Sequence, residues 1–334
     1  MTTADNSKII SNSFMLDIHT KELFGKYLND DNINEICYNG DNLIWTEDIN
    51  GNWHKDIRDD INSTIVTDFA TSAAKFRGLD INEQEPILSC LLSTGERVQI
   101  VVPPAVARDK ISITIRKPSK IRYTMQDYID NGSLDLEIAA MLKKAVENGK
   151  NLIICGETGS GKTTFMKTLT DFIPTTERII TIEDVEELSF KQHENVVGLF
   201  YPSEAKDDDF LRATTCLKSC LRMKPSRILL AELRGAETYD FLNVVSSGHN
   251  GSITSCHAGS VKSCFNRIVM MSMQNRDARI VGKDMILDTA KTIIDMVIVF
   301  KRHNGKRQIM EYLYNGKIYE RSEKDEFHEI GVIQ

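Results

Sequence analysis

A glycine-rich segment of eight residues is the clearest chemical signal in the chain. It reads Gly156-Glu157-Thr158-Gly159-Ser160-Gly161-Lys162-Thr163 and satisfies the phosphate-loop pattern. Its glycines let backbone N–H groups turn inward around phosphate oxygens, and the helix that follows adds positive potential at its N-terminus. Lys162 can reach the β- and γ-phosphates of ATP, and the Thr163 hydroxyl can ligate Mg²⁺. These eight residues, with Thr164 in the next helix, predict a site for ATP or ADP with Mg²⁺.

Two carboxylates follow candidate strands in the same half of the chain. The segment Arg178–Ile182 ends at Glu183, and Arg227–Ala231 ends at Glu232. Ligands on open parallel sheets bind at the carboxyl ends of the strands, so both groups are expected to face the phosphates. One would polarise the attacking water and the other would hold Mg²⁺, together with Thr163; the residue types do not say which. Acidic residues that merely begin a helix are the ordinary alternative.

The second strand departs from the usual phosphate-loop pattern. Ala231 stands where many such enzymes place an aspartate, so Glu232 has to serve in its stead. A third segment, 248–259, places His249 and His257 on either side of a short strand. Isolated histidines are more often structural, but at a strand end His257 is placed to sense the γ-phosphate. No third ligand with suitable spacing supports a zinc site.

The elements that must position these residues differ between the two halves. Up to about residue 120, short strands broken by turn signals and a helix at Thr64–Phe76 predict an α+β module. A polar stretch then predicts a linker, after which Ser133 is expected to cap a helix. From Asn151 strands and helices alternate, which is typical of a parallel sheet covered by helices. The expected strands are Leu152–Cys155, Ile179–Ile182, Ile228–Ala231 and Ser252–Ser255, followed by a meander (Met296–Lys301, Gln308–Tyr314, Lys317–Tyr319) with turns at Asn304-Gly305 and Asn315-Gly316.

Length and composition limit the classes of protein. A chain of 334 residues corresponds to about two domains. The net charge of −7 argues against a duplex-DNA binder whose affinity comes from neutralising phosphates. No apolar run approaches the ~20 residues of a membrane span, and the polar N-terminus does not resemble a secretory signal. We therefore expect a cytoplasmic protein whose seven scattered cysteines are reduced core residues.

Four motifs in a fixed order resemble the secretion and traffic ATPases, the hexameric motors of type II and type IV secretion and of type IV pili. They are Gly156–Thr163, Thr181–Asp184, Leu230–Arg234 and Gly248–Ala258. The N-terminal segments Ile33–Gly40, Gly95–Gln99 and Ile113–Ser119 resemble the type IV secretion branch, the VirB-eleven-type ATPases. The resemblance covers roughly residues 20–320, and the four-cysteine zinc module of type II secretion ATPases is missing.

The resemblance implies roles for particular residues. Thr181–Asp184 matches the aspartate box of the family, with Glu183 as a catalytic candidate, and Glu232 matches its second-strand glutamate. His249 and His257 match its histidine box. Arg97 and Arg116 match arginines of the N-terminal domain that reach the nucleotide phosphates, where a guanidinium can stabilise charge on a transferring phosphoryl group. The ordinary alternative for both arginines is a surface ion pair.

The sequence therefore predicts an α/β protein with a RecA-like phosphate-loop ATPase domain preceded by a smaller α+β domain. We expect an N-terminal cap at residues 1–119, a linker at 120–133 and the ATPase domain at 134–334. The resemblance implies a homo-hexamer on the cytoplasmic face of a bacterial inner membrane that works with other components of the secretion machine and binds no specific nucleic acid. The alternatives are a pilus extension or retraction motor, a RecA-like nucleic-acid motor, and a nucleotide-binding scaffold without turnover.

Overall fold

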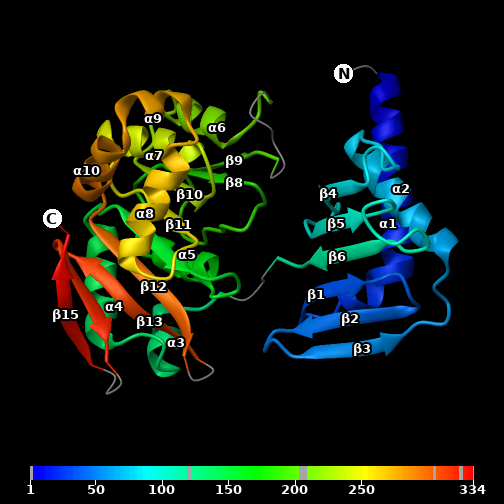
Figure 1. Cartoon of the computed structure of the whole chain (residues 1–334), viewed down its shortest axis with the longest axis horizontal. Helices are drawn as coiled ribbons and strands as arrows, with labels where there is room; N and C mark the ends of the chain where they lie inside the picture. The colour runs from blue at the N-terminus through cyan, green and yellow to red at the C-terminus, as the bar shows by residue number, and fades with distance from the viewer. Residues whose placement is uncertain (1–2, 119–121, 203–208, 304–305, 323–325, 334) are drawn as a thin grey trace. The chain divides into compact units, whose positions relative to one another are not determined.

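The structure is a computed structural model that describes residues 3–118, 122–202, 209–303, 306–322 and 326–333. It divides the chain into two compact units, Met1–Lys120 and Ile121–Gln334, each with its own sheet and core (Figure 1). Within the described residues, no helix is both long and apolar enough to span a membrane. All seven cysteines are free thiols, and six of them are buried as the sequence predicts.

The first unit is an antiparallel sheet packed against two helices. Its elements are α1 (Thr3–Leu28), β1 (Ile33–Tyr38), β2 (Leu43–Asp48), β3 (Trp53–Ile57), α2 (Ser63–Arg77), β4 (Ile87–Leu91), β5 (Arg97–Val101) and β6 (Ser112–Arg116). The strand order is β3-β2-β1-β6-β5-β4. Phe24 of α1 and Phe69 of α2 meet edge to face, with ring centroids 5.1 Å apart, in the core between the helices and the sheet. The predicted α+β module is confirmed, including its helix.

The second unit is built on one nine-stranded mixed sheet. Its elements are α3 (Met125–Asp130), α4 (Leu136–Glu147), β7 (Leu152–Gly156), α5 (Lys162–Thr170), β8 (Ile179–Glu183), β9 (Val196–Phe200), α6 (Ala213–Cys220), β10 (Arg227–Leu233), α7 (Glu237–Ser246), β11 (Ile253–Cys256), α8 (Val261–Ser272), α9 (Arg276–Val281), α10 (Lys283–Ile293), β12 (Met296–His303), β13 (Lys306–Tyr314), β14 (Lys317–Arg321) and β15 (Phe327–Val332). The strand order is β15-β14-β13-β12-β7-β11-β10-β8-β9. Strands β12 to β9 in this order are parallel, and β13, β14 and β15 extend the sheet in antiparallel fashion.

Helices cover both faces of this sheet (Figure 1). Side chains of α3, α4 and α5 pack with Leu152 and Ile154 on one face, whereas side chains of α6, α7, α8, α9 and α10 pack with Ile153 and Cys155 on the other. Successive residues of a strand point to opposite faces, so a strand that is buried on both faces is apolar throughout. All four predicted parallel strands are present; the apolar runs of β7 and β10 fit this rule, whereas β11 also buries the polar Thr254 and Ser255.

The structure corrects the prediction at several places. The range 120–133 contains the helix α3, capped by Thr124, where the sequence suggested only a linker; residues 119–121 are outside the described residues. Asp135, not Ser133, is the N-cap residue of α4. Of the two expected hairpin turns, the one at Asn315-Gly316 has both residues at positive φ, 49° and 75°, as such turns require. The other, Asn304-Gly305, is outside the described residues. Strands β9 and β15 and helix α1 were not expected.

Candidate active site

The predicted phosphate loop joins β7 to α5. Three of its glycines, Gly156, Gly159 and Gly161, have positive φ angles of 155°, 73° and 91°. A side chain at Gly156 would place its Cβ 2.5 Å from the Ser160 hydroxyl oxygen and 2.7 Å from the Phe300 carbonyl oxygen. The loop can therefore close tightly over the end of β7 only with glycine at this position.

The groups around this loop fit a phosphate. Gly161 is the N-cap residue of α5, and neither a side-chain cap nor an acidic residue occupies the first turn. The first N–H groups of a helix have no partner within it and favour an anion. The Ser160 hydroxyl oxygen is buried without a hydrogen-bond partner, and a Cβ at Gly159 would meet nothing within 4 Å. Phosphate oxygens would supply the acceptors that these donors lack.

Lys162 points back into its own loop. Its buried ammonium group donates to the carbonyl oxygens of Gly156 and Glu157, each at 2.9 Å, and lies 3.3 Å from Nδ1 of His257. Because an ammonium group only donates, Nδ1 of His257 is the accepting nitrogen, and the proton of the neutral ring is on Nε2. His257 follows β11, which is the neighbour of β7 in the sheet.

The second nitrogen of the His257 ring is in contact with Glu232. Nε2 of His257 lies 2.7 Å from Oε1 of Glu232. Oε1 is buried, and it is in contact with His257 without a regular hydrogen bond. The structure therefore brings together three of the predicted site residues, Lys162, His257 and Glu232, from three elements that are far apart in the chain.

A guanidinium group holds the second oxygen of Glu232. Nε of Arg234 donates to Oε2 of Glu232 at 2.8 Å, and Nη1 donates to Oδ2 of Asp184 at 2.6 Å. The two carboxylates follow or end the neighbouring strands β8 and β10, and their side chains are only 5% and 16% exposed. Two acidic groups this close repel each other unless a cation lies between them.

Glu183 lies in a different environment from Glu232. Its side chain is 1% exposed, and Oε2 accepts the backbone N–H groups of Glu187 at 2.9 Å and Leu188 at 2.8 Å. Burial raises the pKa of this carboxyl group, although the two N–H donors partly oppose the shift. Its hydrogen bonds thus hold the loop after β8, whereas Glu232 is the carboxylate connected to the phosphate-loop lysine.

The second histidine of the box has a structural position. Nδ1 of His249 lies 3.2 Å from the Val244 carbonyl oxygen and 3.2 Å from the Ser247 hydroxyl oxygen, at the end of α7. These contacts stabilise the end of a helix. Of the two histidines, only His257 is in contact with Lys162 and Glu232.

The predicted arginines of the first unit form a pair. Arg97 on β5 and Arg116 on β6 are directly opposite each other in the antiparallel register, and Glu35 on β1 is opposite Arg116 on the other side. Arg116 lowers the pKa of Glu35, but burial, the larger effect, raises it. Two like charges opposite each other destabilise a sheet. Glu35 supplies a counter-charge to Arg116.

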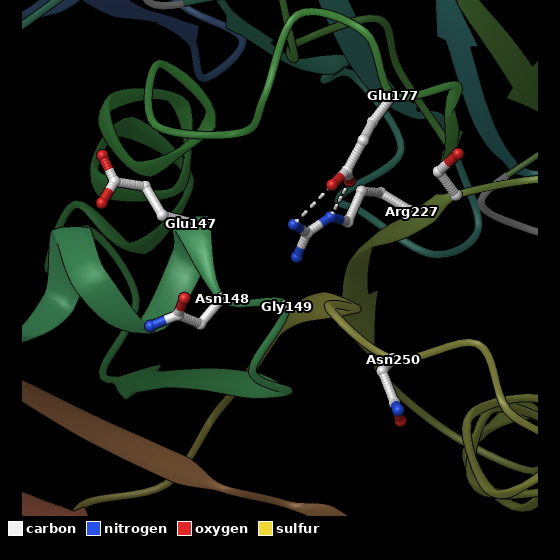
Figure 2. A pocket seen from close by; sticks show the side chains of 7 residues that line it. Glu147, Asn148, Gly149, Glu177, Arg227 and Asn250 are labelled. Carbon is white, nitrogen blue, oxygen red and sulfur yellow. Dashed lines mark hydrogen bonds and ion pairs between the residues drawn. The ribbon is translucent and has the colours of Figure 1, made fainter.

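A separate pocket lies near the amino-terminal ends of the parallel strands. Its volume is about 340 Å³, and it is lined by Glu147, Asn148, Gly149, Glu177, Ser226, Arg227 and Asn250 (Figure 2). Arg227 begins β10, whereas the phosphate loop follows the end of the parallel strand β7. In the pocket the Arg227 guanidinium group forms an ion pair with Glu177 (Figure 2). The pocket shares no residue with the phosphate loop.

A family comparison decides what kind of protein carries this loop. The model of the family described as type II/IV secretion system protein matches residues 21–323, which is most of both units. The chain belongs to this family.

Individual relatives show to which branch of the family the chain is most similar. The type IV secretion system protein VirB11 of Brucella abortus is 43% identical over 303 residues, which cover 84% of this chain and 83% of that protein. The crystal structure of the VirB11 ATPase from the Brucella suis type IV secretion system is 38% identical, with a TM-score of 0.50, and the match covers 92% of this chain and 96% of that one. The chain is thus a type IV secretion ATPase, an ATP hydrolase, as its motifs predict.

The pilus retraction motor PilT shares the fold. Its structure with bound ADP is 18% identical, with a TM-score of 0.57, and the match covers 89% of this chain and 81% of that one. This likeness is consistent with the expected RecA-like domain. At this identity it shows the fold alone, and the closer relatives outweigh it as a guide to function.

The sequence did not identify one pair of residues in the site of this ATPase. Arg234 and Asp184 both lie in recognised motifs, yet nothing in the local pattern shows that the guanidinium group reaches across to the next strand. A basic residue two positions after Glu232 is the one signal in the sequence. Among the described residues, no group of three or more His, Cys, Asp or Glu side chains is arranged to hold a metal ion by itself. Mg²⁺ in nucleotide sites takes few protein ligands and several from phosphate and water, so Thr163 and Glu232 still fit it.

Proposed function

We propose that the unit Ile121–Gln334 hydrolyses Mg-ATP at the phosphate loop, with Glu232 as the carboxylate that activates the attacking water. The observation that carries this proposal is the contact of His257 with both Lys162 and Glu232. His257 thereby connects Lys162, the cation that would bind phosphate, to Glu232, the carboxylate that would act on water. A hydrolytic site needs this arrangement of one group for the phosphate and one for the water.

Nucleotide binding would change the hydrogen-bond partners of Lys162. Lys162 would exchange its two carbonyl acceptors for phosphate oxygens, which accept more strongly because they are charged. Thr163, in the first turn of α5, and Glu232 would hold Mg²⁺, with Glu183 as a further candidate through water. When bound, the metal ion neutralises charge that develops on the phosphates.

Water activation would fall to Oε1 of Glu232. This oxygen is buried and has no hydrogen bond, whereas Oε2 is bonded to Arg234. A carboxylate oxygen with free acceptor capacity in a buried site is suited to take a proton from water. His257, with its proton on Nε2, would sense the γ-phosphate, because Lys162 leaves Nδ1 of His257 when it binds that phosphate.

The first unit would contribute Arg97 and Arg116. Their placement opposite each other concentrates positive charge on one part of the sheet, which supports a role with nucleotide phosphates. A guanidinium group can donate two parallel hydrogen bonds to a phosphate, so each arginine would stabilise the transferring phosphoryl group.

The working form would be a homo-hexamer on the cytoplasmic face of the inner membrane. The family resemblance supports this assembly, in which hydrolysis energises assembly of, or substrate transfer through, a secretion channel. Native mass spectrometry with Mg-ATP tests the number of subunits. Co-purification from the membrane fraction tests the association with inner-membrane and cytoplasmic components, and recovery with a pilus platform protein would favour the pilus motor instead.

A direct assay separates the remaining alternatives. We expect Mg-dependent ATP hydrolysis by the purified full chain without nucleic acid. Stimulation by DNA that falls steeply with salt would favour a nucleic-acid motor. Tight ADP binding without turnover would favour a regulatory scaffold. Hydrolysis that is unaffected by DNA supports the proposed function.

A further inference from the structure

The side chain of Arg234 contacts both Glu232 and Asp184. The Nε and Nη1 donors of one guanidinium group reach the two carboxylates, at 2.8 and 2.6 Å. The fork of a guanidinium group is rigid, so its two hydrogen bonds fix the distance and direction between the carboxylates. A lysine could neutralise the charge but could not impose this geometry.

The backbone that carries Arg234 is itself fixed. Oε1 of Glu237, in the first turn of α7, accepts the backbone N–H groups of Arg234 at 2.6 Å and Gly235 at 2.8 Å. The turn between β10 and α7 is thereby tied to the start of the helix. Arg234 consequently holds its two partners from a stable base.

The consequence for Glu232 is a difference between its two oxygens. Oε2 is occupied by Arg234, and Oε1 is left without a hydrogen bond on the side of His257. Rotation of the carboxylate away from this orientation would break the bond to Arg234. Arg234 therefore holds the carboxylate so that one of its oxygens lies beside His257.

We propose that Arg234 is a positioning residue for ATP hydrolysis, which holds Glu232 and Asp184 so that Oε1 of Glu232 is presented to the attacking water. This rests on the proposed role of Glu232. It adds a residue that acts through Glu232 rather than on the nucleotide. We call Arg234, together with its two hydrogen-bond partners Glu232 and Asp184, the clamp.

The test compares Arg234→Gln and Arg234→Lys with Lys218→Gln in the full chain. Lys218 is an exposed residue of the same unit, 3.7 Å from Asp240, which keeps Thr214 and Asn275 as partners. Binding of a fluorescent ATP analogue and kcat are measured for each variant. We expect Arg234→Gln to bind the analogue within about twofold of the parent, because it leaves Lys162 in place, while kcat falls at least ~10-fold.

The split between kcat and analogue binding separates positioning from simple support of the fold. In Arg234→Gln both contacts of the guanidinium group are lost, so kcat should fall while analogue binding stays close to parental. Arg234→Lys keeps the charge but not the rigid fork, so kcat should remain reduced with parental binding.

Each outcome decides for or against the clamp. A parental kcat in Arg234→Gln would overturn it, as would a loss of analogue binding that equals the loss of kcat. If Arg234→Gln fails to fold, Arg234→Lys decides: parental kcat overturns the clamp, and reduced kcat with parental binding supports it. Should Glu232→Gln itself be fully active, the proposed function fails; should Glu232→Gln be inactive while Arg234→Gln is active, only the clamp fails.

Discussion

The ammonium group of Lys162 lies 3.3 Å from Nδ1 of His257, although 95 residues separate them in the chain. The contact exists because β7 and β11 are parallel neighbours, with Cys155 and Cys256 opposite each other in the register. Parallel strands align their carboxyl ends at one edge of the sheet. The phosphate loop and the histidine box are thus adjacent by topology.

Replacement of Lys162 by alanine should abolish hydrolysis and sharply weaken ATP binding. The variant removes the cation that reaches the phosphates, and the loop glycines that shape the backbone stay in place. Lys143→Ala is the matched control, because Lys143 is an exposed residue of α4 paired with Glu147. Equilibrium binding, steady-state turnover and circular dichroism are the measurements. Near-parental turnover in Lys162→Ala would contradict the assignment of this loop as the phosphate-binding site.

The two histidines of the box should differ when each is replaced by alanine. His257→Ala loses the contacts to Lys162 and Glu232, so we expect turnover to fall roughly 10-fold or more. His249→Ala loses contacts at the end of α7, so a modest loss of thermal stability with near-parental turnover is expected. Equal turnover in the two variants would contradict the separation that the structure makes.

The parallel sheet was predictable because its strands are buried on both faces. Runs such as Leu152–Cys155 are apolar without alternation, and the phosphate loop after the first run fixed its direction. Helix α1 was missed because its first residues are polar. The buried Leu16, Leu23 and Phe24 do follow a helical spacing, which could have revealed it.

The site was predictable only where its chemistry is local in sequence. Glu183 and Glu232 each follow an apolar run of a predicted strand, so the sequence pattern does not distinguish them. Their environments differ because Glu183 accepts two N–H groups of the loop that follows it, whereas Glu232 is held by Arg234. Such differences depend on where a loop folds back, which no short pattern encodes.

The two arginines of the first unit should matter to turnover more than to the fold. The double change Arg97→Ala with Arg116→Ala should lose most ATPase activity while ADP binding is retained, because the phosphate loop is untouched. The control is the exposed pair Arg77→Ala with Arg108→Ala. Parental activity in the first double variant would favour the surface ion-pair reading.

Glu183 should make the stability of the protein depend on pH. Burial raises the pKa of its carboxyl group in the folded state above that of about 4.3 in an unfolded chain. The group therefore favours folding most below its unfolded pKa, and this contribution is lost as pH rises through the folded pKa. A glutamine at 183 does not ionise, so its contribution to stability does not change with pH. The melting temperature of Glu183→Gln minus that of the parent should therefore increase from pH 4.5 to pH 8, by a few degrees at most. A difference in melting temperature that is constant with pH would contradict this.

The most direct test of the central claim is a single-turnover measurement on Glu232→Gln. Glutamine keeps the size of the side chain and an acceptor for Arg234, but it cannot take a proton from water. The account predicts that this variant binds Mg-ATP close to the parental affinity and cleaves it at least ~100-fold more slowly. Cleavage of bound ATP at the parental rate would contradict it.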